Sequence, residues 1–226
     1  MIDNCLIETA NHLAINGCFW RNLGLCNGKI GIAIFLFHYS RYSTEDSYKY
    51  IAENLIDDVY NEMHDMLTID LEDGYCGIGW GLQHLYNYKF ICGDINQILL
   101  EIDEKIMERD VVRIKDKGIL NGLGGILHYV LIRLSNNINN NIFDADYLLR
   151  LSLSSEKIID LKSESEIITL AQSYLSYYKS NKLNYYDKDL INLLSDSRIY
   201  KNDEFKELNW LGRNNKIMKN TKLVIL

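Results

Sequence analysis

Proline is absent from all 226 residues, whereas average usage of about 5% would give roughly eleven. Because proline interrupts helices, its absence permits many long helices. The longest apolar stretch, Ile30 to Phe37, is far shorter than the ~20 residues that a membrane helix needs. Lysine and arginine total 24 against 31 aspartates and glutamates, a net charge of −7 without a basic cluster. The sequence therefore argues against membrane spans, nucleic-acid binding and docking on anionic membranes.

Disulfide and nucleotide motifs are also lacking. The five cysteines are an odd number without a Cys-x-x-Cys pair, and the first residues show no basic segment followed by an apolar run. We therefore expect a cytoplasmic protein with free thiols. No Walker A loop, dinucleotide fingerprint, Gly-x-Ser-x-Gly elbow or His-Glu-x-x-His helix occurs. With 47% hydrophobic and 24% charged residues, the composition is that of a folded protein.

Three segments repeat the pattern [N/D]-G-x-x-G-I-x-x-x-[L/V]. They begin at Asn27, Asp73 and Asn121. Their first glycines are 46 and 48 residues apart, a period typical of helical hairpins. The six glycines of the motif are Gly28, Gly31, Gly74, Gly77, Gly122 and Gly125.

The pattern predicts the start of a helix in each repeat. Asn27, Asp73 and Asn121 are expected as N-caps or turn residues. We expect the first glycine to tolerate positive φ and the second to let another backbone approach closely. Glycine inside a helix costs about 0.5–1 kcal/mol relative to alanine, so the repeated pairs imply a packing demand.

Longer amphipathic segments lie between the motifs. Tyr48–Met66 and Asp94–Arg109 each carry one apolar stripe, and Asp94 is a predicted N-cap. We expect short glycine-headed helices in an inner layer and longer helices in an outer layer. This arrangement would bring Asn27, Asp73 and Asn121 to one concave rim.

The repeat pattern weakens after residue 135. We divide the chain into a repeat region, 1–135, and a helical continuation of the same domain with divergent repeats, 136–226, joined by the polar run 136–141. Helices are predicted over 154–160, 164–179 and 188–195, with a capping box from Ser163 to Glu166. The apolar, β-prone tail 219–226 fits no helical hairpin.

Several residue types admit both a functional and a structural interpretation. His38 and His84 both lie seven residues after the second glycine of their repeats, where the third repeat has Ile132. This favours a packing position over a metal pair. Cys26 precedes a predicted helix start, where a thiol is activated by the helix dipole, but a small buried cysteine explains it more simply.

Carboxylates and aromatic residues gather near the second motif. Asp70, Glu72 and Asp73 suggest general acid/base chemistry of the glycosidase kind, although capping and solvation explain them more simply. Sixteen tyrosines and three tryptophans suit either a peptide- or glycan-binding concave surface or a helical core. The residues that we select as candidates for substrate binding are Asn27, Asp73, Trp80, His84 and Asn121.

The three motifs resemble those of the lanthionine synthetase C-like proteins over roughly residues 20 to 135. The resemblance implies an α/α toroid and, in the cyclase branch, a zinc ion that activates peptide thiols for thioether formation. The family's zinc ligands stand in Cys-x-Gly-x-x-Gly and Cys-His-Gly-x-x-Gly contexts. Cys26 matches a ligand position, whereas Asn27 stands at the histidine position, and Glu72 and Leu120 stand at the later cysteine positions.

One ligand of three matches, so we expect no metal or other cofactor. The predicted fold is all-α, a partial or small α/α toroid of helical-hairpin repeats. The predicted function is a non-zinc accessory or peptide-binding component of ribosomal peptide modification, with a precursor peptide or a modification enzyme as partner. The alternatives are a divergent zinc-dependent thioether cyclase and a glycan-active α/α enzyme.

Overall fold

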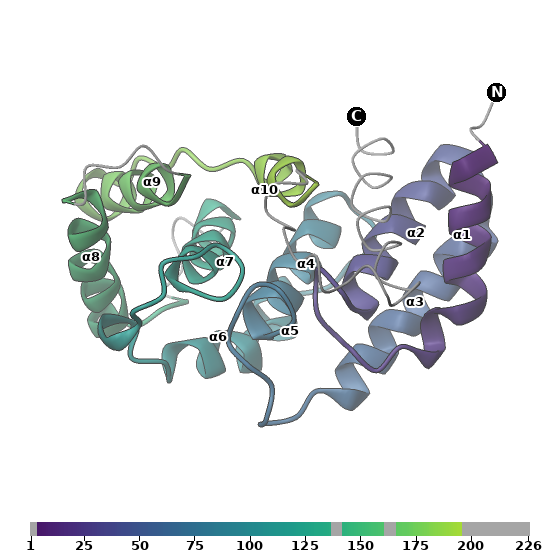
Figure 1. The fold of residues 1–226 in the computed structure, drawn as a ribbon, viewed down its shortest axis with the longest axis horizontal. Helices are drawn as coiled ribbons and strands as arrows, with labels where there is room; N and C mark the ends of the chain where they lie inside the picture. Colours follow the sequence, from purple (N-terminus) through teal and green to yellow (C-terminus); the bar gives the residue numbers. More distant parts are fainter. Residues whose placement is uncertain (1–3, 137–141, 161–165, 196–226) are drawn as a thin grey trace. The chain divides into compact units, whose positions relative to one another are not determined.

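The computed structural model describes residues 4–136, 142–160 and 166–195, which form ten α-helices, two 3-10 helices and no strand (Figure 1). The all-α prediction is therefore confirmed. No helix within these ranges is long and apolar enough to cross a membrane. The elements are α1 (Asn4–Asn16), η1 (Gly17–Phe19), α2 (Lys29–Ser43), α3 (Asp46–Glu62), α4 (Tyr75–Asn87), α5 (Ile95–Ile98), α6 (Leu100–Met107), η2 (Val111–Arg113), α7 (Leu123–Asn136), α8 (Ala145–Ile159), α9 (Glu166–Ser180) and α10 (Asp187–Leu194).

The chain divides into two compact units. Unit 1 comprises residues 1–67 and 188–226, and unit 2 comprises residues 68–187. Unit 1 therefore contains the first glycine motif, and unit 2 contains the second and third. The division that we predicted at residue 135 concerns where the repeat pattern ends, and it stays a prediction.

In unit 1, α2 packs against both α1 and α3. Its residues Lys29–Ser40 are all buried, whereas α3 buries a single stripe made by Tyr48, Ala52, Leu55 and Val59. The Lys29 ammonium is 1% exposed and lies 3.1 Å from Asp58 and 2.8 Å from Glu62 of α3. Burial lowers the pKa of Lys29, but hydrogen bonds and charges from Glu62 and Asp58 raise it more, so the net pKa is raised.

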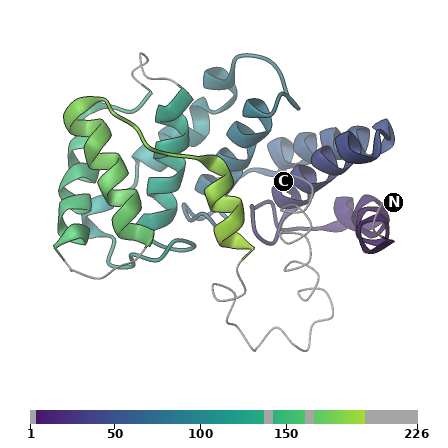
Figure 2. The ribbon, with the colours of Figure 1, turned by 90° about the horizontal axis from the view of Figure 1, so that it is seen from above.

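In unit 2, α4 and α7 form the interior. They pack against each other, α6 covers α4, α9 covers α7, and α8 packs on α9 (Figure 2). Residues Tyr75–Leu85 of α4 and Leu123–Leu134 of α7 are all buried. In each unit the glycine-headed helices are thus the inner ones, as we expected, but they are not consistently shorter than the helices that follow them.

The loop before each glycine-headed helix folds back and caps it with backbone carbonyl groups. The first helical N–H donates to the carbonyl oxygen seven residues earlier in all three repeats: Lys29 to Asn22 at 2.9 Å, Tyr75 to Thr68 at 2.9 Å, and Leu123 to Asp116 at 3.0 Å. The next two N–H groups of α2 and α4 repeat this seven-residue spacing. Helix N-terminal donors that need partners are therefore satisfied by the loop.

This geometry decides one prediction and corrects another. Of the two roles predicted for Asn27 and Asp73, N-cap or turn residue, the structure shows the second, because the N-cap residues are Gly28 and Gly74, without a side-chain hydrogen bond. The first glycine does not adopt positive φ, since φ is −135° at Gly28 and −106° at Gly74. Glycine is required instead because a Cβ there would overlap backbone atoms of the returning loop.

The second glycine of the third repeat lies where other atoms approach closely. At Gly125 a Cβ would lie 2.7 Å from both the Ile119 carbonyl oxygen and the Leu71 Cβ, so the close approach predicted for the second glycine is confirmed there.

The predicted helix 94–109 is divided at Leu99 into α5 and α6, and the Asp94 carboxylate accepts a hydrogen bond from Asn96 N at 3.0 Å, which caps α5. The helices predicted after residue 150 correspond to α8, α9 and α10. Ser163 and the tail 219–226 lie outside the described residues.

A buried ion pair joins the helices of unit 2. Arg133 of α7 is fully buried, and its guanidinium donates to Asp103 of α6 at 2.6 and 3.2 Å. It also donates to Gln83 of α4 at 2.9 Å and to Asn96 of α5 at 3.2 Å, while the Tyr129 hydroxyl donates to Asp103. Burial raises the pKa of Asp103, and Arg133 and Tyr129 offset this only in part. The pair therefore contributes mainly a fixed arrangement of the helices.

We expect Gly74→Ala to lower the free energy of unfolding by about 3 kcal/mol, because the added methyl meets backbone that cannot move away. Gly118→Ala is the matched control, since its Cβ would meet chiefly the end of the Asp116 side chain. Urea unfolding measures both variants. Equal stability of the two would contradict the steric role of Gly74.

Arg133→Met should destabilise the protein by about 4 kcal/mol, because it leaves Asp103 buried without its charged partner. Arg113→Met removes an exposed pair with Asp110 and should change stability by less than about 0.5 kcal/mol. Thermal unfolding of both variants tests this, and a small effect at Arg133 would show that unit 2 does not depend on the ion pair.

Candidate functional site

The loops before α4 and α7 lie side by side in unit 2. Leu71 N and Glu72 N both donate to the Leu120 carbonyl oxygen, at 2.9 and 3.3 Å. The Asn121 side-chain amide donates to Glu72 Oε2 at 3.2 Å. The structure therefore brings together the turns that carry Asp73 and Asn121, two of the residues predicted for the rim.

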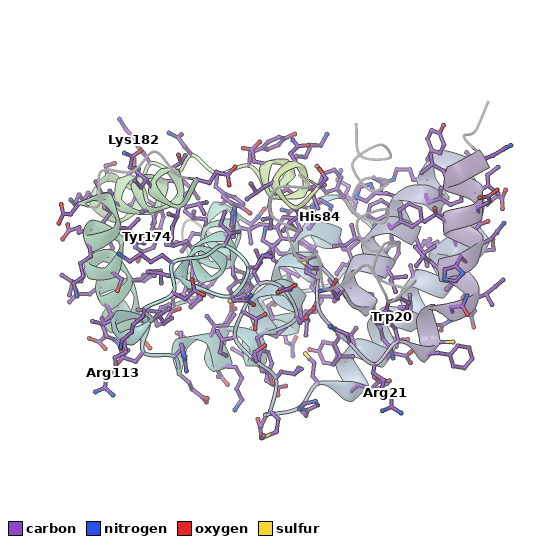
Figure 3. The ribbon with its side chains drawn as sticks, viewed as in Figure 1. Trp20, Arg21, His84, Arg113, Tyr174 and Lys182 are labelled. Carbon is purple, nitrogen blue, oxygen red and sulfur yellow. The ribbon has the colours of Figure 1, made fainter. Side chains whose placement is uncertain are left out.

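The corresponding turn of unit 1 is held by an aromatic side chain. Trp20 Nε1 donates to the Asn27 carbonyl oxygen at 2.7 Å (Figure 3). Asn27 is half-buried, and Cys26 beside it is buried. Because Asn27 belongs to unit 1, the rim shared with Asp73 and Asn121 stays a prediction.

Trp80 and His84, the other two candidates, are fully buried in α4. Trp80 Nε1 donates to the Tyr185 hydroxyl at 2.6 Å, and His84 Nδ1 lies 3.0 Å from Asp187 Oδ2 (Figure 3). The His84 ring also stacks on Trp80 and contacts Tyr88, with ring centroids 5.1 and 4.4 Å apart. Tyr185 and Asp187 of the same unit thus contact these two side chains, whose role in substrate binding stays a prediction.

The positions that correspond to His84 in the other repeats are buried too. His38 is 4% exposed and Ile132 is fully buried. The three equivalent positions thus hold histidine twice and isoleucine once, and all three side chains are buried.

His128 is a buried polar residue that the sequence analysis did not select. It lies in α7 at 4% exposure, and its ring meets Tyr185 edge-on at 5.9 Å. Among the residues that the structure describes, neither ring nitrogen has a hydrogen-bond partner. Burial lowers the pKa of His128 to about 3. Its position three residues after Gly125 corresponds to Trp80 in the second repeat, so comparing the repeats would have indicated its place beside Trp80.

The residues at the family's zinc positions match a zinc centre only in part. Catalytic zinc takes three protein ligands of imidazole, thiolate or carboxylate type. Cys26 and Glu72 carry such groups, whereas Asn27, Leu120 and Asn121 do not. Over the part of the chain that the structure describes, no group of three or more histidine, cysteine or acidic side chains is placed to hold a metal.

The acidic cluster is already engaged by the loops. Asp70 Oδ1 accepts hydrogen bonds from Asp73 N at 2.9 Å and Gly74 N at 3.1 Å, and Glu72 binds Asn121. This agrees with the capping interpretation of the cluster. Burial raises the pKa of the Cys76 thiol, with Asp70 and Asp103 adding to the effect, so this cysteine is not an activated nucleophile.

Paired helices that begin at repeated glycine loops define the chain as a helical-hairpin repeat protein. The family model described as lanthionine synthetase C-like protein matches residues 20–193, which is more than half of the chain. The chain therefore belongs to the lanthionine synthetase C-like family, whose fold is an α/α toroid. The match continues past residue 135 through α8 and α9, where no glycine motif indicated it. No curated protein matches the sequence.

The unpartnered His128 predicts a stability that falls in mild acid. Since the folded pKa is about 3, below the ordinary 6.5, the unfolded chain takes up a proton first as the pH falls. Between pH 7.5 and 5 this costs about 2 kcal/mol of unfolding free energy. His128→Phe should lose that part of the pH dependence in urea titrations. If His128→Phe shows the same difference in unfolding free energy between pH 7.5 and pH 5 as the parent protein, the low pKa of His128 would be contradicted.

Proposed function

We propose that the chain is a peptide-binding component of ribosomal peptide modification of the lanthipeptide type, without zinc chemistry of its own. The observation that carries the proposal is the contact between Glu72 and Asn121. The family loops stay joined there, while Asn27, Leu120 and Asn121 stand at ligand positions without a group that binds zinc. A site that retains the contact between the family's loops but only part of the zinc-ligand set suits peptide binding better than metal-assisted thiol addition.

The proposed contact surface in unit 2 is the paired edge formed by Glu72, Asp73 and Asn121. Asn121 is exposed, and Glu72 and Asp73 are half-buried, with Oδ1 of Asp73 turned into the protein. Carboxylate and amide groups bind backbone N–H groups and cationic side chains. A precursor peptide offers both, and Asn27 of unit 1 is the corresponding residue of the first repeat.

Binding of a dehydrated precursor peptide of the lanthipeptide type, followed by calorimetry, tests this surface. Asn121→Ala should weaken binding about fivefold, because one charge-assisted hydrogen-bond position is lost. Glu101→Gln, an exposed change on α6 of the same unit, should leave the affinity within about twofold. No binding above a scrambled peptide would overturn the proposal.

The divergent zinc-dependent cyclase is the alternative that family membership favours. Elemental analysis of the purified protein and of Cys26→Ala separates it from the proposal. We expect no stoichiometric zinc in either sample. Zinc that is present in the parent protein and lost in the variant would favour the cyclase.

A further inference from the structure

A non-helical segment covers the buried face of α4 and α7 in unit 2. This strap, residues Asn181–Asp187, leaves α9 through Asn181, whose φ is 52°, and ends at the first residue of α10 (Figure 1). Its residues 182–186 form no helix or strand. Two side chains, Tyr185 and Asp187, attach it by hydrogen bonds to α4.

Burial alternates along the strap. Tyr185 and Asp187 are half-buried, whereas Asn184 and Tyr186 are exposed, the latter at 54%. The two half-buried residues present a hydroxyl and a carboxylate to α4, and the side chain between them is exposed to solvent.

The strap supplies hydrogen-bond partners to only some of the buried polar side chains that it contacts. Trp80 receives a hydroxyl acceptor and His84 a carboxylate, but His128 meets the edge of the Tyr185 ring. Within the described part of the chain, both His128 nitrogens are buried without a hydrogen-bond partner, which is unfavourable. A segment that kept the first two contacts and offered His128 a polar group would be bound better than the strap.

We propose that the strap is an intramolecular stand-in for a peptide, and that an extended segment with the pattern hydroxyl-bearing residue, any residue, acidic residue displaces it from Trp80, His84 and His128. The hydroxyl would accept from Trp80, the acid would bind His84, and a peptide group would reach His128. This inference rests on the proposed function and names the sequence class of the bound peptide.

The covalent connection of the strap to α9 and α10 determines how strongly it lowers the affinity of the site for a peptide. Because the strap is joined to α9 and α10, it competes at a high effective concentration and weakens the binding of any peptide to the same residues. Opening the strap should therefore raise affinity without adding a contact.

The probe is a fluorescein-labelled peptide with the strap's own sequence, Lys182–Asp187, and anisotropy measures its binding to the full chain. The double variant Tyr185→Ala/Asp187→Ala should bind the labelled peptide at least about tenfold more tightly than the parent protein does. Tyr186→Ala, which changes the exposed neighbour, should bind like the parent. A probe with asparagine in place of its aspartate should lose the gain.

Circular dichroism and thermal unfolding establish that the opened variant is folded, and Tyr185→Phe supplies a milder opening that removes only the hydroxyl. Equal, weak binding by folded parent, Tyr185→Phe and the double variant would overturn the proposal and leave the strap a permanent cover. A precursor peptide that binds through Asn121 while strap variants have no effect would refute this inference alone. Absence of all peptide binding would refute the proposed function as well.

Discussion

The fold depends on the close return of each loop to the start of the helix that it precedes. Carbonyl groups seven residues earlier receive the first N–H groups of α2, α4 and α7, and only glycine at positions 28, 74 and 122 leaves room for that backbone. The same contact caps the interior helices and fixes the loops at their ends. It therefore positions both the paired edge around Asn121 and the buried face around Trp80.

Each unit also contains a buried cation that acidic side chains hold from another helix. Arg133 meets Asp103 in unit 2, and Lys29 meets Asp58 and Glu62 in unit 1. Charges removed from water are costly unless every partner is in place, so such contacts fix one arrangement of helices against competing ones. In unit 2 the Arg133 guanidinium joins α7 to α6 through Asp103 and to α4 through Gln83.

The glycine repeats predicted the starts of α2, α4 and α7 and their interior position, because a costly glycine inside a helix signals a packing demand. They did not predict how the helices are capped, since the carbonyl groups that replace Asn27 and Asp73 as caps belong to the backbone and leave no sequence signal. Trp80 and His84 were selected as binding candidates, although the repeats also favoured a packing position for His84, and both side chains are buried. His128 and the strap were missed because their contacts join α4 and α7 to residues far along the chain.

If a peptide replaces the strap, α4 and α7 beneath it should keep their structure. Native-state hydrogen exchange of the full chain, with and without a saturating peptide of the hydroxyl-x-acid class, distinguishes replacement from a permanent cover. Strap amides should exchange through a low-energy opening, faster still when the peptide is bound, while the amides of α4 and α7 remain protected. Strap amides that exchange only with global unfolding, and do not respond to peptide, would contradict replacement of the strap.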